Sequence, residues 1–223
     1  MAARGLRVER EIDFTTARRP VSERARLASQ SVTSVPEILT FRQDDLPEGL
    51  RRQVLALHRQ AWPSIGERRS GPMHDPALRP VSMTLVAAGR VLAALDILSK
   101  EIEHGGARYA ASGLSTVVTD EAVRGRGHGR RLVVAAREAI AASGADVGIF
   151  TCDRPLAPFY ESAGWTVLPG TVLVGGTAEE PFPSDQWDKV TLARFFSARA
   201  QDASAQFAGA RIALYPGPID KLW

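Results

Sequence analysis

The residues most suited to chemistry lie in one stretch, VRGRGHGRRLVVAAREAI, at positions 123–140. Three glycines and four arginines fall between positions 123 and 131, directly before an apolar, alanine-rich run. Glycine lets a backbone approach a bulky anion closely, and the first turn of a helix offers unpaired N–H groups and a partial positive charge. The stretch therefore predicts an anion cradle suited to a diphosphate. A nucleic-acid-binding loop and an ordinary tight turn are the alternatives.

The spacing of the glycines separates this loop from two common phosphate-binding motifs. No Gly-Lys-Ser/Thr follows it, as a P-loop requires, and glycines at 125, 127 and 129 do not match G-x-G-x-x-G. The pattern that fits is R-x-x-G-x-G, formed by Arg124, Gly127 and Gly129. In this motif the sequence resembles the GNAT superfamily of acyl-CoA N-acyltransferases, where it lies between a central strand and a helix and holds the pyrophosphate of coenzyme A.

The resemblance implies that acetyl-CoA is the co-substrate. Its pyrophosphate would bind the loop, and its pantetheine would pair like an added strand with the backbone of the preceding strand. The cofactor-binding residues expected on this basis are Thr116, Val117, Val118, Arg124, Gly125, Arg126, Gly127, His128, Gly129 and Arg130.

A second motif, APFYESAGW at positions 157–165, looks like the F-Y-x-x-x-G-F/W segment of the same superfamily. It places Tyr160 on the tyrosine that serves there as general acid, giving a proton to the departing CoA thiolate. A phenol suits this role because its pKa near 10 keeps it protonated at neutral pH. The alternative for Tyr160 is a helix residue that only packs on Trp165.

The general base is not visible in the sequence. The segment ASGLSTVV at positions 111–118 lacks the glutamate that the family often places near the amine. Asp153 stands at a strand end beside the expected thioester, although it is also placed to cap the following helix. A water chain that ends on a backbone carbonyl is a further option.

A third resemblance concerns the aminoglycoside 2'-N-acetyltransferase branch of the superfamily. GWTVLPGTVLV at positions 164–174, and a tail with an acid close to a final tryptophan, are similar to that branch. The resemblance implies that acidic side chains and the terminal carboxylate bind a polycationic sugar. The substrate-binding residues expected are Asp153, Asp185, Asp188, Asp220 and Trp223; the alternative for each acid is a solvated surface position.

The composition narrows the class of protein. The chain has 223 residues, is 44% hydrophobic, and contains no run of the roughly 18 apolar residues that a membrane helix needs. The single cysteine, Cys152, excludes an internal disulfide and a multi-cysteine zinc site, and the four histidines lack metal-ligand spacing. Cys152 as a nucleophile is weighed against a small buried hydrophobe, which is commoner. With no signal-peptide core at the N-terminus, we expect a cytoplasmic protein without a metal.

The positive charge is unevenly distributed. Residues 1–36 contain seven arginines and four acids, whereas the remainder balances 21 basic residues against 21 acidic ones. A nucleic-acid-binding domain is more often basic where it folds, so the pattern disfavours nucleic acid as a partner. We expect a basic extension over 1–36, for which a disordered leader or a misplaced start codon is the alternative, and one domain over 37–223.

Hydrophobic periodicity predicts an α/β (α+β) domain. Alternating runs and turn residues indicate an antiparallel meander followed by a β-α-β unit, hence a mixed, mostly antiparallel central sheet with helices on both faces. A loop or a broken helix is expected at 63–80, and a loop is expected at 181–184. The predicted strands span 38–41, 82–88, 91–99, 107–119, 146–151, 165–168 and 189–195, and the predicted helices span 47–62, 127–143 and 155–163.

Together these features predict an N-acetyltransferase that moves an acetyl group from acetyl-CoA to a primary amine of a small molecule, such as an aminoglycoside or a similar aminated natural product. A polyamine, an amino acid and a protein N-terminus are alternative acceptors. A CoA-binding sensor without catalysis and an RNA-binding protein that reads through RGRGHGRR are alternative functions. We expect no nucleic-acid or membrane partner, and the oligomeric state stays open, a homodimer included.

Overall fold

The architecture is built on a seven-stranded sheet with the strand order β1-β2-β3-β4-β5-β9-β6. The computed structural model describes residues 35–63 and 73–223. Every pair of neighbouring strands in this sheet is antiparallel except β4 and β5, which are parallel, so the expected mixed and mostly antiparallel sheet is confirmed. Its strands are β1 (Glu37–Arg42), β2 (Val81–Ala87), β3 (Arg90–His104), β4 (Ala107–Thr119), β5 (Val147–Asp153), β6 (Thr166–Val167) and β9 (Lys189–Phe195).

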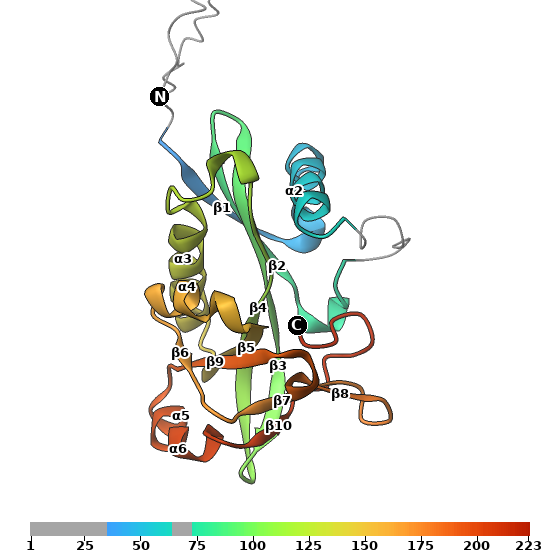
Figure 1. Cartoon of the computed structure of the whole chain (residues 1–223), viewed down its shortest axis with the longest axis vertical. Helices are drawn as coiled ribbons and strands as arrows, with labels where there is room; N and C mark the ends of the chain where they lie inside the picture. The colour runs from blue at the N-terminus through green and yellow to red at the C-terminus, as the bar shows by residue number, and fades with distance from the viewer. Residues whose placement is uncertain (1–34, 64–72) are drawn as a thin grey trace, which may run out of the picture. The chain divides into compact units, whose positions relative to one another are not determined.

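Two long helices cover opposite faces of this sheet, as Figure 1 shows. On one face, α2 (Glu48–Ala61) buries Val54 and Leu57 against Val86, Val91 and Val118 of the sheet. On the other face lies α3 (His128–Ala142), whose buried side chains Leu132, Val133, Ala136 and Ile140 recur at helical spacing. Strand β3 contributes to both cores: Val91 and Ala94 belong to the core under α2, and Leu92, Ala93 and Leu95 belong to the larger one.

The helix ends follow from local sequence. Pro47 precedes the first residue of α2, where its missing N–H costs nothing. Gly144 follows α3 with a φ of +81°, a left-handed conformation that glycine adopts without steric cost. The other α-helices are α4 (Ala157–Ser162), α5 (Ala198–Asp202) and α6 (Ser204–Phe207). Short 3-10 helices span η1 (Gln43–Asp45), η2 (Pro76–Leu78), η3 (Glu121–Val123), η4 (Arg154–Leu156) and η5 (Ser184–Trp187).

Strand β4 is irregular where the sheet opens. Its register with β3 shifts by one residue between the pairs Ala94↔Val118 and Asp96↔Ser115, and Thr116 at this bulge has a φ of +49°. Its pairing with β5 is limited to Ala111↔Val147 and Ser112↔Gly148. Beyond residue 112, β4 remains paired with β3 on one side, but on the other side it faces a fork between β4 and β5.

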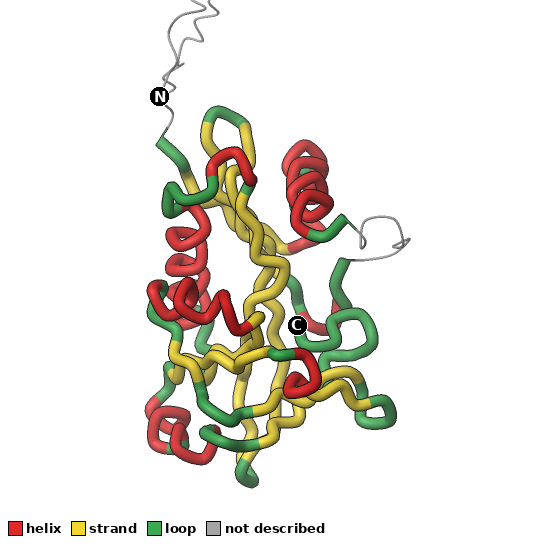
Figure 2. The backbone as a smooth tube through the Cα atoms, viewed as in Figure 1, coloured by secondary structure: helices red, strands yellow, loops and turns green. Residues whose placement is uncertain are grey.

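The C-terminal tail returns to this fork. Lys100 of β3 donates hydrogen bonds to the carbonyl oxygens of Leu214 and Tyr215, both at 2.7 Å. Farther along, the Trp223 indole Nε1 donates to the backbone oxygen of Ile149 in β5 at 2.9 Å. A Cβ at Gly113 of β4 would lie 2.5 Å from that nitrogen, so the indole fits because residue 113 is glycine. Figure 2 shows the tail as a loop that ends beside the central strands.

Most predicted elements are confirmed, with three corrections. Residues 181–184, expected as a loop, include the strand β8 (Pro181–Pro183) of a second sheet, which has the order β10-β7-β8. The other strands of that sheet, β7 (Val172–Gly176) and β10 (Arg211–Ala213), and the helices α5 and α6 were not expected. The capping role expected for Asp153 is also wrong. Its side chain makes no capping hydrogen bond and instead accepts one from Lys189 Nζ at 2.6 Å.

Two expectations concern regions that the structure describes only in part. The N-terminal extension over 1–36 lies outside the described residues except for Val35 and Pro36. Of the expected loop over 63–80, residues 64–72 lie outside the described residues, and the remainder contains η2.

Candidate functional site

The glycine loop has the backbone geometry of an anion site. Gly125 and Gly127 have φ angles of +78° and +79°, and a Cβ on either would meet open space. Gly127 is the N-cap of α3 and provides no side-chain cap, so the first-turn amides stay available to an outside acceptor. The loop therefore leaves room for a group that approaches the backbone closely, and the residues present fit the phosphates of a CoA ester.

Gly129 fixes the position of the loop against its neighbours. It is buried, and a Cβ there would lie 2.7 Å from the Thr119 hydroxyl and 3.5 Å from the Phe159 ring. Arg130 Nε, one residue later, donates to the backbone oxygen of Ser162 at 2.9 Å. The start of α3, the end of β4 and helix α4 are thereby held together, which brings the helix of Tyr160 beside the glycine loop.

Tyr160 is buried among aromatic rings. Its ring meets those of Phe150 and Phe159 edge-on, with centroid separations of 5.0 and 4.9 Å. Burial raises the pKa of Tyr160 above its ordinary value, and the nearby Cys152 and Asp153 act in the same direction. The phenol therefore stays protonated at neutral pH, which is the state that a general acid needs.

Cys152 does not have the environment of a nucleophile. Its side chain is buried in the main core, and burial raises the pKa of its thiol to about 11. Because the thiolate is the reactive form, a thiol that stays protonated at neutral pH is inert. The structure favours the small buried hydrophobe over the covalent route.

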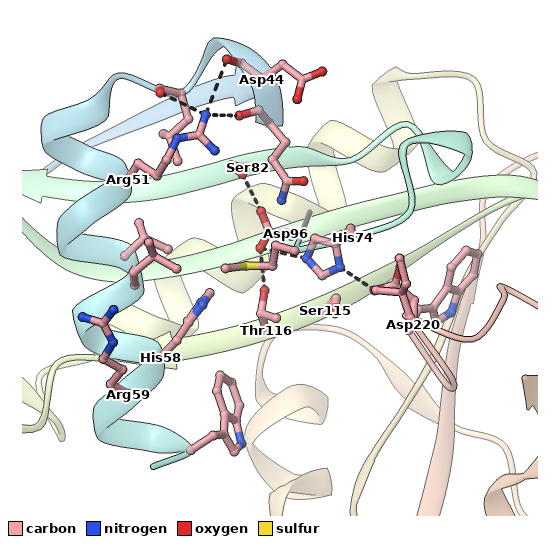
Figure 3. Close-up of a pocket in the computed structure, with 18 of the residues that line it drawn as sticks. Asp44, Arg51, His58, Arg59, His74, Ser82, Asp96, Ser115, Thr116 and Asp220 are labelled. Carbon is pink, nitrogen blue, oxygen red and sulfur yellow. Dashed lines mark hydrogen bonds and ion pairs between the residues drawn. The ribbon is translucent and has the colours of Figure 1, made fainter. Parts of the chain in front are cut away.

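A cavity of about 580 Å³ opens on the face of the sheet that carries α2 (Figure 3). Four separate parts of the chain form its walls: α2 with the residues before it, the segment around His74, strands β2 to β4, and the tail. The lining residues are Gln43, Asp44, Leu46, Arg51, Val54, Leu55, His58, Arg59, Trp62, Met73, His74, Ser82, Asp96, Ser115, Thr116, Ile219, Asp220, Lys221, Leu222 and Trp223.

A buried polar cluster forms one wall of this cavity. His74 lies between two carboxylates, with Nδ1 2.5 Å from Asp220 Oδ1 and Nε2 3.2 Å from Asp96 Oδ2. Asp96 also accepts hydrogen bonds from the hydroxyls of Ser82 at 2.5 Å and Thr116 at 2.6 Å. The cluster therefore joins the tail, the sheet and the segment before η2 through a few side chains (Figure 3).

The charges within the cluster follow from its contacts. Burial alone would lower the pKa of His74, but the hydrogen bonds to Asp220 and Asp96 outweigh it and raise that pKa to about 9. Burial opposes ionisation of Asp96, yet the hydrogen bond from His74, assisted by the two hydroxyls, lowers its pKa. At neutral pH a charged imidazolium thus lies between two carboxylates, which compensates their buried charge.

His58 enters the cavity from α2 and points toward Thr116 (Figure 3). Burial lowers its pKa below the ordinary value, and the charge of His74 acts in the same direction, opposed by Asp96. Its Nε2 atom is buried and has no hydrogen-bond partner among the described residues. The ring centroid of Trp62, one turn later in α2, lies 5.6 Å away.

The structure brings some of the predicted site residues together and separates others. Asp220, Trp223 and Thr116 line the cavity, and the loop residues 124–130 are gathered at the start of α3. The three remaining acids form ion pairs elsewhere and do not line it: Asp153 with Lys189, Asp188 with Arg154 at 2.8 Å, and Asp185 with Arg211 at 2.8 Å. Tyr160 also lies outside the residues that line the cavity.

Sequence reasoning did not identify Asp96, His74 and His58 as site residues. Asp96 carried a usable signal, because a lone acid inside the apolar run VLAALDIL is buried only at a cost unless it is paired. His58 carried a weaker one, since it lies one turn after Val54 on the apolar face of the predicted helix. His74 carried none, because its partner Asp220 is 146 positions away.

The family model of the acetyltransferase (GNAT) domain matches residues 44–168, more than half of the chain. An acyl-CoA N-acyltransferase from Pseudomonas aeruginosa has a similar structure, with a TM-score of 0.50 and 17% identity over 72% of this chain and 99% of that one. ElaA from Escherichia coli gives a TM-score of 0.51 and 18% identity over the same shares of the two chains. These two likenesses show the fold.

No curated protein matches this sequence. Among the described residues, no helix combines the length and the apolar character that crossing a membrane requires.

Proposed function

Because this chain belongs to the GNAT acetyltransferase domain family, we propose that it transfers an acetyl group from acetyl-CoA to a primary amine of a small molecule. The observation that carries the proposal is the position of strand β4. Its bulge at Thr116 borders the cavity, its far edge faces the open fork with β5, and its end at Thr119 contacts the glycine loop. A thioester along this edge would meet an amine from the cavity.

Acetyl-CoA supplies the activated acetyl group as a thioester. The amides and arginines around Gly127 bind its pyrophosphate, and the main chain of Thr116, Val117 and Val118 pairs with its pantetheine. Backbone N–H groups of the same segment stabilise the negative charge that develops on the thioester oxygen. In the reaction a C–N bond forms, the C–S bond breaks, and Tyr160 gives its proton to the leaving thiolate.

The chemistry of the cavity supports an amine as the acceptor. Asp96 and Asp220 contribute carboxylates to its wall, and its volume of about 580 Å³ is in the range of pockets that bind small molecules. The narrower part of the proposal is an aminoglycoside or a similar aminated natural product, which rests on the resemblance of the tail and of positions 164–174 to the 2'-N-acetyltransferase branch. Polyamines, amino acids and protein N-termini are the competing acceptors.

A panel of amines tests the proposal. The full chain is incubated with acetyl-CoA and, in turn, an aminoglycoside, a polyamine, an amino acid and a short peptide, and the release of CoA thiol is followed. We expect thiol release with at least one primary amine and N-acetylation of that amine by mass spectrometry. Activity with another amine but with no aminoglycoside would contradict the aminoglycoside part of the proposal and leave the acetyl transfer standing.

The rival function is a CoA-binding sensor without catalysis. It is favoured if CoA protects the protein against thermal unfolding while no amine in the panel releases thiol. Thermal protection by CoA together with thiol release on an amine supports the acetyltransferase.

A further inference from the structure

The proton of the acceptor amine needs a base, and the three titratable groups of the buried cluster in the cavity wall are already engaged. Asp96 accepts hydrogen bonds from His74, Ser82 and Thr116, and its lowered pKa makes it a poor proton acceptor. Asp220 accepts from the His74 ring and from the Asp75 amide at 2.9 Å. His74 has a carboxylate on each ring nitrogen and carries a proton at neutral pH.

His58 differs from these groups in that one of its ring nitrogens is not engaged by any described residue. It lines the same cavity, and its buried Nε2 has no hydrogen-bond partner among the described residues. A buried polar atom without a partner costs free energy, so its presence at a cavity wall points to a partner supplied by a bound molecule. Because burial lowers the pKa of His58, the imidazole is neutral at pH 7 and keeps a lone pair.

The position of His58 relative to β4 indicates which molecule this lone pair would meet. The ring points from α2 toward Thr116, the residue at the bulge of β4 (Figure 3). The proposed function puts the thioester carbonyl along the main chain of Thr116 to Val118. An amine in the cavity that attacks this carbonyl therefore lies between the strand and the imidazole.

We propose that His58 is the general base that removes the proton from the acceptor amine, an assignment that rests on the proposed acetyl transfer. The proton passes from the amine nitrogen to Nε2 of His58 as the C–N bond forms. The C–S bond breaks, and the thiolate takes its proton from Tyr160. The imidazolium of His58 then releases its proton to water and the Tyr160 phenolate takes one from water, so both groups are restored and protons balance over the cycle.

The charges around His58 set its pH dependence. Asp96 from β3 and a hydrogen bond with the Thr116 backbone of β4 favour the imidazolium, and His74 from the segment before η2 disfavours it. From α2 itself Arg59 lines the cavity, and from the tail Asp220 and Lys221 do so. With burial as the largest influence, the base should be neutral at and above its ordinary pKa of about 6.5 and become protonated only below it.

The test compares His58→Gln with the wild-type chain, using the best amine from the panel. Glutamine keeps a polar side chain but cannot take a proton at these pH values. We expect kcat to fall by about 10² to 10⁴ and the acidic limb of the kcat profile to disappear. The affinity for acetyl-CoA, measured by calorimetry, should stay within about twofold. The matched control is His104→Gln, because His104 bonds to the backbone oxygen of Gln206 at the far end of β3 and does not line the cavity.

The outcomes separate the two proposals. A wild-type chain that acetylates an amine, with His58→Gln equally active and showing the same pH profile, overturns the assignment of His58 and leaves the proposed function standing. A wild-type chain that acetylates none of the amines overturns both. If His58→Gln does not fold, the wild-type profile decides. An acidic limb below pH 6.5 supports the assignment, and a kcat that stays constant down to the lowest pH at which the chain remains folded overturns it.

Discussion

The glycine loop and the acceptor cavity are built in opposite ways. The loop is seven consecutive residues, 124–130, held by the helix that follows it. The cavity wall depends on residues as distant as His74 and Asp220, which are 146 positions apart and 2.5 Å from each other. In the proposed function the loop binds the phosphates of acetyl-CoA, which the family shares, whereas the cavity receives the acceptor amine. A site made of consecutive residues can be identified from the sequence. A site whose residues are brought together by folding requires the structure.

The largest expected effect concerns Tyr160, whose helix lies beside the glycine loop. Tyr160→Phe removes only the hydroxyl that we expect to protonate the thiolate, so kcat should fall by about 10² to 10⁴ while the affinity for acetyl-CoA barely changes. Steady-state kinetics with calorimetry measures both. Tyr109→Phe is the control, because Tyr109 is equally buried but packs against Phe207. A Tyr160→Phe enzyme with the wild-type kcat would remove Tyr160 from the mechanism.

In the cavity wall, the contacts of His74 should make the unfolding free energy depend on pH. The pKa of His74 is raised to about 9 in the folded chain, against about 6.5 when unfolded, so its contribution is complete below pH 6.5 and is lost as the pH rises through 9. The loss is on the order of 3 kcal/mol, since one pKa unit corresponds to about 1.4 kcal/mol.

Denaturant unfolding at pH 6 and pH 10 measures this loss. The difference in unfolding free energy between wild type and His74→Gln should be larger at pH 6 than at pH 10. An equal difference for His74→Gln at the two pH values would show that the imidazolium is not what joins the tail to the sheet.

A smaller effect concerns the backbone of the loop. Gly127→Ala forces a side chain into a left-handed conformation, which costs about 1–2 kcal/mol, and puts a methyl group where the phosphates are expected. We expect acetyl-CoA to bind at least tenfold more weakly, as measured by calorimetry. Gly89→Ala is a close control, because Gly89 has a φ of +75° and open space around its Cβ, but lies in the β2–β3 turn. Equal binding by Gly127→Ala and wild type would exclude close approach at this residue.

The smallest effect tests the contact of the tail with the fork. Trp223→Phe removes the indole N–H and leaves the Ile149 oxygen without this donor, which should lower the unfolding free energy by about 1–3 kcal/mol. Thermal or denaturant unfolding gives the value. No change would mean that the hydrogen bond at the fork does not stabilise the tail.

The sequence predicted those elements whose determinants are local. Helix α3 ends just before Gly144, and the loop that precedes the helix contains its glycines in order, so both were expected correctly. Asp153 was assigned to a helix cap because it precedes Pro155, but antiparallel pairing of β5 with β9 puts Lys189 directly opposite it. The register between distant strands decides this contact, and no local pattern encodes it.

The second sheet and the cavity escaped prediction for the same physical reason. Strand β8 contains Pro181 and Pro183, which a sheet tolerates at its edge, and β8 is an edge strand. Strand β10 has three residues and forms only because the tail pairs with β7. His74 and Asp96 become neighbours only after the sheet and the segment around His74 are in place.

Calorimetric titration of the full chain with acetyl-CoA tests the central claim most directly. If the amides at the start of α3 and the edge of β4 that faces the fork bind acetyl-CoA, the titration shows one site per chain. Gly127→Ala then lowers the affinity for acetyl-CoA, and Gly89→Ala does not. The absence of heat and of thermal protection by acetyl-CoA would contradict the account.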